Sequence, residues 1–232
     1  MTATRNRTGN ATPDATMSRD REAPRVVEPQ GNVVDYLFER RLSADEAARS
    51  YLVLPEHNVS FSEMQRRVCQ VGRLLQSLGV EPGDRVMFSV RDGIDFPAIF
   101  LGAMKIGAVA VPINTFLQVR DYAYYVRDSG ARVLIVDHGL VAKIDVIRDE
   151  AAFPRDLFVV GGDAAGYRRF EAEAEAQAGE LATVPRQPDD TGVRLYSYGS
   201  TADPKGVVPP HAPRSWAPDP FGTAPLARAA PR

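Results

Sequence analysis

The sequence predicts an α/β fold in which a mainly parallel sheet is flanked by helices. Two uninterrupted apolar runs, VLIV at 133–136 and LFVV at 157–160, are typical of strands that are buried on both faces. Between such runs, apolar residues recur every three or four positions, which is the spacing of a helix with one buried face. Strand-like and helix-like segments alternate along most of the chain, and this alternation favours parallel strands joined by helices.

Start and stop signals define the elements of the first part of the chain. A helix begins near Asn32, which is a suitable cap, and Ser60-x-x-Glu63 forms a capping box ahead of a second helix that Gly79 ends. A turn at 55–58 separates two short apolar runs and predicts a small hairpin. The expected elements are the helix from Asn32, the hairpin strands 51–54 and 59–61, the helix 64–78 and the strand 85–90.

The same alternation continues through the second part. Asp95 is expected to cap a helix that Gly107 ends, and the acidic run EAEAEAQA indicates an exposed helix or a poorly packed insertion at 167–179. A linker that contains proline and aspartate follows at 181–191. The expected elements are the helix 95–106, the strand 108–113, the helix 119–128, the strand 132–137, the helix 140–147 and the strands 156–160 and 193–197.

Composition narrows the classes of function. With 28 Lys and Arg against 30 Asp and Glu, the chain has a formal charge of −2 and no basic stripe for nucleic acid. No apolar run approaches the roughly 18 residues of a membrane span. The single cysteine, Cys69, excludes an internal disulfide and is expected to act as a small hydrophobic residue of a helix. Because no hydrophobic signal segment is found, we expect a cytoplasmic protein.

The stretch YSYGSTADPKGVV at 196–208 has the composition of a phosphate-binding loop. Gly199 and Gly206 allow the backbone to approach a ligand closely, and the hydroxyls of Ser200 and Thr201 are hydrogen-bond donors. Lys205 supplies a compact positive charge that suits a phosphate oxygen. Since Lys205 is not followed by Ser or Thr, the loop is not a Walker A loop. The alternative is a polar surface turn.

The loop resembles the signature Ser/Thr-Gly-Ser-Thr-Gly-x-Pro-Lys-Gly of the adenylate-forming (AMP-binding) superfamily, which includes acyl- and aryl-CoA synthetases. Two positions depart from that pattern, because Tyr198 replaces a small hydroxyl residue and Ala202 replaces a glycine. Upstream, residues 100–136 are similar to the recurrent GAxKxGAVxVPxNT and DSxAxxLxV segments of the family, and the benzoate-CoA ligase branch is the most similar. Matching signature positions are Gly199, Ser200, Thr201, Pro204, Lys205 and Gly206.

The resemblance implies carboxylate activation, in which ATP and an acid give an acyl-adenylate and CoA then displaces AMP. ATP, Mg²⁺ and CoA are the implied cofactors, and a carboxylic acid, with an aromatic acid favoured, is the implied substrate. Neither a catalytic residue nor a metal ligand is assigned, and Lys105, Asn114 and Asp128 are interpreted as scaffold. The implied ATP-phosphate site consists of Ser197, Gly199, Ser200, Thr201, Lys205 and Gly206.

Two terminal segments differ in composition from the segment 32–208, which is expected to be a partial AMP-binding domain. Residues 1–31 are polar and are expected to be a disordered tail, as are residues 209–232, which are rich in Pro, Ala and Arg. The second tail has the composition of out-of-frame translation and replaces the later motifs of the family. We therefore expect an incomplete amino-terminal subdomain that is inactive alone, with a separately encoded remainder as a possible partner.

Two other interpretations belong to different classes of protein. The first is a non-enzymatic α/β module that binds a nucleotide or pairs with a partner. An open reading frame just downstream that encodes the missing motifs would favour the ligase over this module. The second is a generic dinucleotide-binding domain, which is weak because no Gly-x-Gly-x-x-Gly follows the first strand of the predicted sheet.

Overall fold

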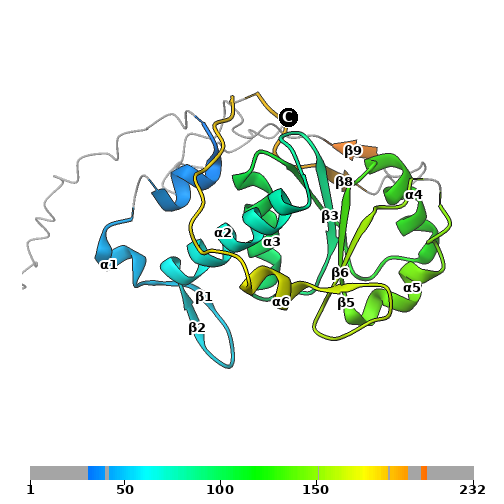
Figure 1. Ribbon diagram of the computed structural model, residues 1–232, viewed down its shortest axis with the longest axis horizontal. Coiled ribbons are helices and arrows are strands. Elements are labelled where there is room, and N and C mark those ends of the chain that lie inside the picture. The colour runs from blue at the N-terminus through cyan, green and yellow to red at the C-terminus, as the bar shows by residue number, and fades with distance from the viewer. Residues whose placement is uncertain (1–30, 40–41, 151, 188, 198–204, 208–232) are drawn as a thin grey trace, which may run out of the picture.

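A computed structural model describes residues 31–39, 42–150, 152–187, 189–197 and 205–207 (Figure 1). Its main sheet has the strand order β4-β3-β5-β6-β7, and every neighbouring pair is parallel, so the predicted α/β fold is confirmed. Apart from Gly31, the predicted tails lie outside the described residues. The strands are β3 (Arg85–Ser89), β4 (Val109–Pro112), β5 (Val133–Asp137), β6 (Asp156–Val160) and β7 (Arg168–Arg169).

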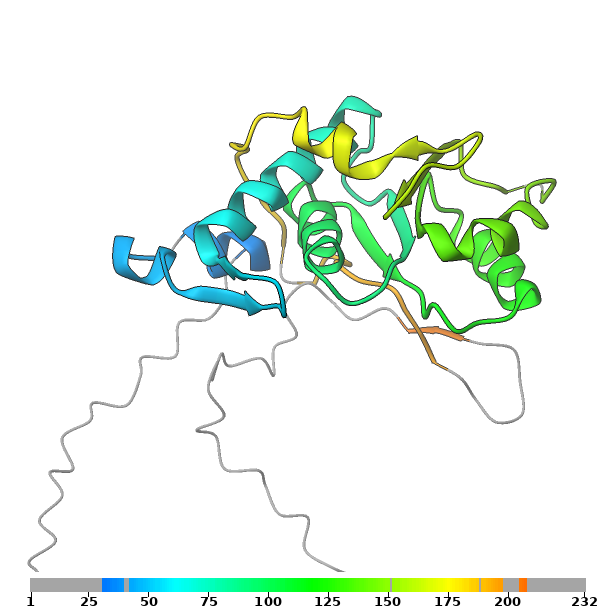
Figure 2. The same cartoon turned by 90° about the horizontal axis from the view of Figure 1, so that it is seen from below.

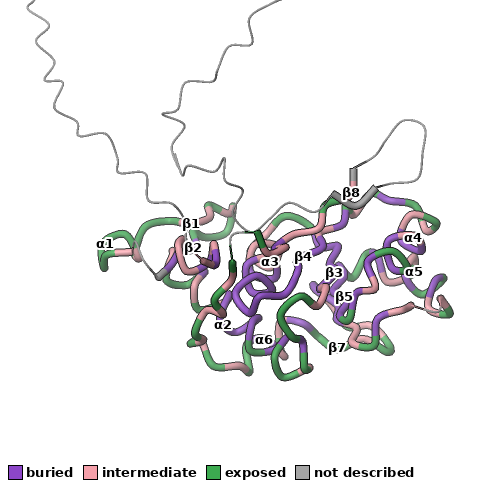
Figure 3. The backbone as a smooth tube through the Cα atoms, turned by 90° about the horizontal axis from the view of Figure 1, so that it is seen from above, coloured by how far each residue is buried: buried purple, intermediate pink, exposed green. Residues whose placement is uncertain are grey.

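Helices cover both faces of this sheet (Figures 1 and 2). Alternate residues of a strand point to opposite faces, so Phe88 packs against one helical layer and its neighbour Met87 packs against the other. All of β5 is buried, as the VLIV run predicted, and Figure 3 shows buried backbone running through the strands. One layer contains α2 (Phe61–Ser77), α3 (Asp95–Lys105) and α6 (Phe170–Glu175), and the other contains α4 (Val119–Ser129) and α5 (Val141–Asp145).

Helices α2 and α3 approach closely because each has a glycine in their contact. A Cβ atom at Gly102 of α3 would lie 2.7 Å from Cγ1 of Val71 on α2 and 3.2 Å from the Val68 carbonyl oxygen. A Cβ at Gly72 of α2 would lie 3.4 Å from the Gly102 carbonyl oxygen of α3 and 2.6 Å from Cδ2 of Leu181, which belongs to the segment after α6. Glycine weakens a helix by about 1 kcal/mol relative to alanine. At these two positions the close packing that glycine allows therefore offsets its lower helix propensity.

The predicted helix starts are confirmed at two places and wrong at a third. Ser60 and Glu63 form the reciprocal capping box of α2, and the Asn32 side chain accepts the Val34 N–H. At α3, however, Ile94 precedes the helix and Asp95 is its first residue, without a capping hydrogen bond. The Asp95 carboxylate lies toward Arg67 of α2 instead, with Oδ1 3.6 Å from Nη1.

The helix predicted at 140–147 is split into two short pieces. A 3₁₀ turn, η2 (His138–Leu140), precedes α5 because the carboxylate of Asp137 accepts the Gly139 N–H and begins the turn at the end of β5. Ile144 and Ile147 are buried, as the helical spacing predicted. By contrast, the helix predicted at 119–128 corresponds closely to α4, which Gly130 ends in the left-handed conformation.

Residues 167–179 are part of the folded domain, which corrects the expectation of an exposed helix or a poorly packed insertion. Strand β7 pairs with β6, and the following helix α6 buries Phe170 and Ala174. These two residues are four positions apart, so they lie on one helical face. The helix that carries the acidic run is packed, and the run is only partly solvated, because the Glu171 carboxylate accepts the Gly161 N–H while Glu175 is exposed.

The predicted linker at 181–191 is held against the carboxyl end of α3. The Val184 N–H donates to the Lys105 carbonyl, and Nζ of Lys105, which is 1% exposed, donates to Oγ1 of Thr183 at 2.8 Å. The amide of Asn32 bridges the same region by donating to the carbonyls of Met104 and Val184. Lys105 therefore has the scaffold role that its sequence position predicted.

The amino-terminal elements form a smaller part at one end of the molecule (Figure 1). Strands β1 (Ser50–Val53) and β2 (Asn58–Ser60) pair antiparallel and confirm the predicted hairpin. Before them lie the π-helix η1 (Asp35–Glu39) and the short helix α1 (Ala44–Ala47). None of the described helices combines the length and the apolar character that crossing a membrane requires.

Candidate functional site

The stretch with the phosphate-loop composition connects two strands of an antiparallel ribbon. Strand β8 (Leu195–Ser197) precedes it and strand β9 (Lys205–Val207) follows it. Ser197 and Lys205 are Cα partners in this ribbon, so the pairing brings together two predicted site residues that are eight positions apart. Gly206 pairs with Tyr196 in the same ribbon. The other predicted site residues, Gly199, Ser200 and Thr201, lie outside the described residues.

The ribbon continues from the edge of the main sheet. Val193 forms a parallel bridge with Ala110 of β4, and the two segments run in the same direction. Residues 195–197 therefore extend toward the carboxyl ends of the strands, where α/β sheets usually bind ligands. Figure 2 shows β8 and β9 leaving the body of the sheet at this edge. The predicted strand at 193–197 is thus present as a bridge followed by β8.

A set of polar and aromatic contacts fixes β8 to helix α4. The Tyr196 hydroxyl donates to Oδ2 of Asp128 at 2.7 Å, and Nη2 of Arg194 lies 3.1 Å from the same oxygen. Nη1 of Arg194 also donates to the Asp128 carbonyl at 3.1 Å. The Tyr196 ring packs on that of Tyr125 with a centroid separation of 4.3 Å. We call the three residues Arg194, Tyr196 and Asp128 the Tyr196 clamp.

The Tyr196 phenol is held in its neutral, hydrogen-donating form. Burial, and after it the hydrogen bond to Asp128, raises the pKa of Tyr196 above its ordinary value. A phenol that keeps its proton throughout the neutral range continues to donate to the carboxylate. Asp128, interpreted from the sequence as scaffold, therefore has a structural role at the base of the candidate loop.

Other polar groups at the carboxyl edge of the sheet are also bonded to one another. The buried Ser89 hydroxyl, at the end of β3, lies 3.0 Å from the Tyr122 hydroxyl, which donates to the Asn114 carbonyl. The Asn114 side chain in turn accepts the Phe116 N–H and orders the turn after β4. The described contacts of Asn114 are thus structural, and its interpretation as scaffold stays a prediction.

An ion pair links the ends of β3 and β5. Nε of Arg91 lies 2.7 Å from Oδ2 of Asp137. Burial acts to raise the pKa of Asp137, but the hydrogen bonds from Arg91 and the Gly139 N–H together hold that pKa below its ordinary value. The carboxylate is therefore ionised near neutral pH and acts as an anchor for both segments.

The described residues contain no cluster of side chains that could hold a metal ion by itself. Within residues 31–39, 42–150, 152–187, 189–197 and 205–207, no group of three or more His, Cys, Asp and Glu side chains is arranged in this way. Mg²⁺ in nucleotide sites is usually held by one or two carboxylates together with substrate phosphates, and no residue is assigned to it.

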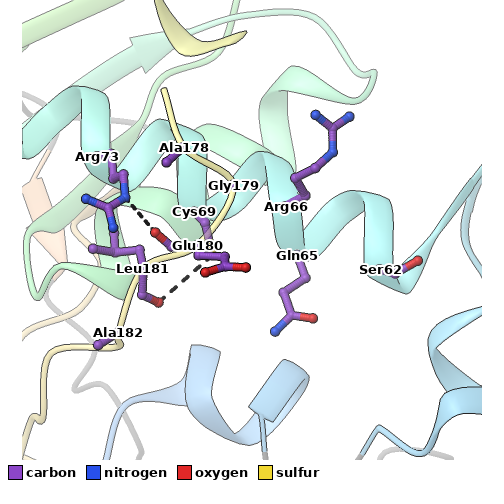
Figure 4. Close-up of a pocket in the computed structure, with 10 residues that line it drawn as sticks. All are labelled: Ser62, Gln65, Arg66, Cys69, Arg73, Ala178, Gly179, Glu180, Leu181 and Ala182. Carbon is purple, nitrogen blue, oxygen red and sulfur yellow. Dashed lines mark hydrogen bonds between the residues drawn. The ribbon is translucent and has the colours of Figure 1, made fainter. Parts of the chain in front are cut away.

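An open polar groove lies along α2, apart from the β8–β9 ribbon (Figure 4). It has a volume of about 860 Å³ and is bordered by Arg66 and Arg73 of α2 and by the segment 178–182. Nε of Arg73 donates to the Glu180 carbonyl. Cys69 is buried under the segment, with 3% of its surface exposed, which confirms its expected role as a small hydrophobic residue of a helix.

Two carboxylates, those of Asp95 and Glu175, pair with Arg67 where α2, α3 and α6 meet, and the charge of Glu171 also acts on Asp95. Nη1 of Arg67 lies 3.6 Å from Oδ1 of Asp95, and Nη2 lies 3.6 Å from Oε1 of Glu175. Burial raises the pKa of Asp95, and the nearby charges of Glu171 and Glu175 add to this rise, while Arg67 opposes it. One cation therefore compensates the three carboxylates only partly.

The raised pKa of Asp95 leads to a pH-dependent prediction. The folded chain holds the Asp95 proton more tightly than the unfolded chain, so this residue makes stability fall as pH rises from its ordinary pKa through the raised one. We expect Asp95→Asn to remove that fall, so that the variant gains stability relative to the wild type between pH 4 and pH 7. Urea denaturation at both pH values measures the difference. Asp163→Asn, at a side chain that is 84% exposed, is the control. An equal effect of Asp95→Asn at both pH values would contradict the prediction.

The fold defines a class of α/β proteins with a parallel sheet between two helical layers and a two-stranded ribbon beyond the edge strand β4. Residues 38–217 match the model of a family described as "AMP-binding enzyme". The match covers most of the chain, and the chain therefore belongs to the AMP-binding enzyme family.

Two ligases of aromatic acids are among the proteins that this chain resembles. Benzoate-CoA ligase of Thauera aromatica is 37% identical over 182 residues, which are 78% of this chain and 34% of that enzyme. A 3-hydroxybenzoate-CoA/4-hydroxybenzoate-CoA ligase of the same organism is 33% identical over 186 residues, which are 79% of this chain and 35% of that enzyme. The predicted resemblance to the benzoate-CoA ligase branch is confirmed at the level of the family.

The fold of this chain also matches a solved structure of an aryl-CoA ligase. The anthranilate CoA ligase AuaEII, solved in complex with anthranoyl-AMP, has a TM-score of 0.75 and 34% sequence identity over 79% of this chain and 35% of that one. The chain thus spans about a third of the length of the relatives it matches, and its sheet corresponds to the amino-terminal part of adenylate-forming enzymes.

Sequence reasoning missed the contacts that hold β8 against α4. Asp128 and Tyr196 are 68 residues apart, so no local pattern indicates that they meet. The aromatic run at 122–125 was a partial signal, because tyrosines are enriched where one end of a side chain is buried and the other is polar. That signal does not identify the partner strand.

Proposed function

We propose that the chain is the amino-terminal part of an ATP-dependent carboxylate-CoA ligase of the cytoplasm that acts on an aromatic acid such as benzoate. Residues 32–208 form the partial AMP-binding domain in this proposal. The observation that supports this proposal is the register of the β8–β9 ribbon, which sets Ser197 opposite Lys205 at the carboxyl edge of the sheet. The aromatic acids in the names of the relatives support the choice of substrate class.

In the proposed reaction, a carboxylate oxygen of the acid forms a bond to the α phosphorus of ATP and pyrophosphate leaves. The sulfur of CoA, after loss of its thiol proton, then attacks the acyl carbon and AMP leaves. The part assigned to this chain is to hold the β and γ phosphates. The backbone N–H groups and hydroxyls of Ser197, Gly199, Ser200, Thr201 and Gly206, with the charge of Lys205, are assigned to that task.

We further propose that this chain alone binds ATP without completing the reaction. The chain spans about a third of the length of these relatives. A separately encoded remainder stays the proposed partner for turnover. The distinguishing measurement is formation of benzoyl-CoA from benzoate, ATP and CoA by the purified chain. Turnover by the chain alone would overturn this part of the proposal and leave the assignment to a ligase intact.

Calorimetry of ATP binding to the full chain tests the assigned site. Lys205→Ala is expected to weaken binding by about tenfold or more, since a charged hydrogen bond contributes about 1.5–3 kcal/mol. Lys143→Ala is the matched control, because it removes the same charge from α5, where Nζ donates to the Leu117 carbonyl. Absence of ATP binding by a folded wild-type sample, or equal affinities of the two variants, would overturn the phosphate site.

A further inference from the structure

The orientation of the β8–β9 ribbon depends on contacts outside the ribbon itself. A two-stranded ribbon is only marginally stable in water, so its position is set by what it packs against. On the β8 side, the described contacts are the bridge from Val193 to Ala110 and the Tyr196 clamp on α4. The bridge joins the segment to the sheet before β8 begins, whereas Tyr196 of the clamp lies within β8.

The clamp fixes both the direction and the rotation of β8. The Tyr196 hydroxyl is bound to Asp128, and the Tyr196 ring packs on Tyr125 and lies near Tyr124, so the side chain is held at its tip and along its length. Arg194, two residues earlier and on the same side of the extended chain, bonds both the carboxylate and the carbonyl of Asp128. Rotation of β8 about its axis would break these contacts together.

We infer that Tyr196 and Asp128 are positioning residues for the β8–β9 ribbon and, through it, for Ser197 and Lys205 of the proposed phosphate site. Their hydrogen bond holds β8 against α4 and thereby sets where Ser197 and its partner Lys205 stand. The inference rests on the proposed function, because it assigns the clamp to the same phosphate site. Neither residue is assigned a contact with ATP.

The chain contains a second contact of the same chemistry, which provides a matched control. The Tyr167 hydroxyl donates to Oδ1 of Asp145 at 3.0 Å, and the guanidinium carbon of Arg148 lies 4.6 Å from the Tyr167 ring centroid. Burial, followed by this hydrogen bond, raises the pKa of Tyr167 to about 12. This group joins α5 to the β6–β7 connection, away from the ribbon. Removing the Tyr167 hydroxyl therefore removes a tyrosine–aspartate hydrogen bond like that of Tyr196, but at a place away from the ribbon.

The test compares Tyr196→Phe with Tyr167→Phe in the full chain by two measurements. Calorimetry measures ATP affinity, and we expect Tyr196→Phe to bind about fivefold to tenfold more weakly, a loss of the size of one hydrogen bond. Tyr167→Phe is expected to bind as the wild type does. Hydrogen exchange of the β8 and β9 amides is expected to quicken in Tyr196→Phe alone.

Variants of Asp128 provide a rescue. Asp128→Asn keeps an oxygen that can accept from Tyr196 and is expected to bind ATP within about threefold of the wild type, since a neutral hydrogen bond is weaker by a modest amount. Asp128→Ala removes the acceptor and is expected to match Tyr196→Phe. Equal affinities of Asp128→Asn and Asp128→Ala would contradict a positioning hydrogen bond.

The two measurements separate failure of the inference from failure of the proposed function. If the wild type binds ATP and Tyr196→Phe keeps that affinity, the positioning inference is overturned and the phosphate site stands. If the folded wild type does not bind ATP, the phosphate site is overturned, and with it the assignment of Tyr196 and Asp128 to it. Equal exchange of the β8 and β9 amides in Tyr196→Phe and Tyr167→Phe would by itself overturn the inference.

Discussion

Replacing Phe88 with alanine is expected to lower the free energy of unfolding by about 3–5 kcal/mol. Phe88 is fully buried in the central part of the sheet, and its ring lies 5.3 Å from that of Phe96 and 6.5 Å from that of Phe100. Its removal leaves a cavity between β3 and α3, because the rings on α3 are held by the helix. Such a loss is a large part of the roughly 5–15 kcal/mol that stabilises a typical domain.

The matched control for this substitution is Phe116→Ala. Phe116 is 87% exposed in the turn after β4, so the same change removes little packing there. We expect its effect to stay within about 0.5 kcal/mol. Urea denaturation monitored by circular dichroism measures both variants, and similar midpoints for Phe88→Ala and Phe116→Ala would show that the sheet core is wrongly described.

The second large effect is expected at the contact between α2 and α3. Gly102→Ala places a Cβ atom 2.7 Å from Cγ1 of Val71, closer than unstrained carbon atoms approach. We expect a loss of about 1–3 kcal/mol from overpacking, although alanine is the better helix former by about 1 kcal/mol. A change of the Val71 rotamer does not relieve the contact, because Cβ of Val71 would also lie 2.8 Å from the new atom, so the helices must separate.

Two further variants identify the cause of that loss. Gly93→Ala is the control, because a Cβ atom there would meet nothing within 4 Å. Val71→Gly in the Gly102→Ala background removes both side-chain atoms that clash, Cγ1 at 2.7 Å and Cβ at 2.8 Å, so the two changes are expected to couple by about 0.5–3 kcal/mol. Additive effects in this double-mutant cycle of unfolding free energies would argue against a direct clash.

Much of the fold could be predicted because its signals are local. The VLIV run at 133–136 gives a fully buried strand, and the Ser60 capping box begins α2 where expected. Asp95 was predicted as a cap, yet its carboxylate lies beside Arg67 of another helix, which no local pattern shows. Local spacing predicts which face of an element is apolar, but the partner of that face is a long-range property.

The difference between local patterns and long-range contacts also explains which predictions failed at 167–179 and at the candidate site. The dense glutamates of the acidic run obscured the four-residue spacing of Phe170 and Ala174, which is the feature that packs α6. At the site, glycine and lysine predict a phosphate loop by composition alone. The pairing of Ser197 with Lys205 depends on the register of two strands, and this register is decided by contacts that the motif does not contain.

The bridge between Val193 and Ala110 has a consequence for the chain as it is being synthesised. The outward N–H and C=O groups of Ala110 on β4 are satisfied by Gly192 and Arg194, while Pro112 has no N–H to expose. Because the two partner segments are 83 positions apart in the sequence, a ribosome working at 5–20 residues per second leaves this edge open for about 4–17 s. During that interval Ala110 is the point of β4 at which a neighbouring nascent chain can add a strand.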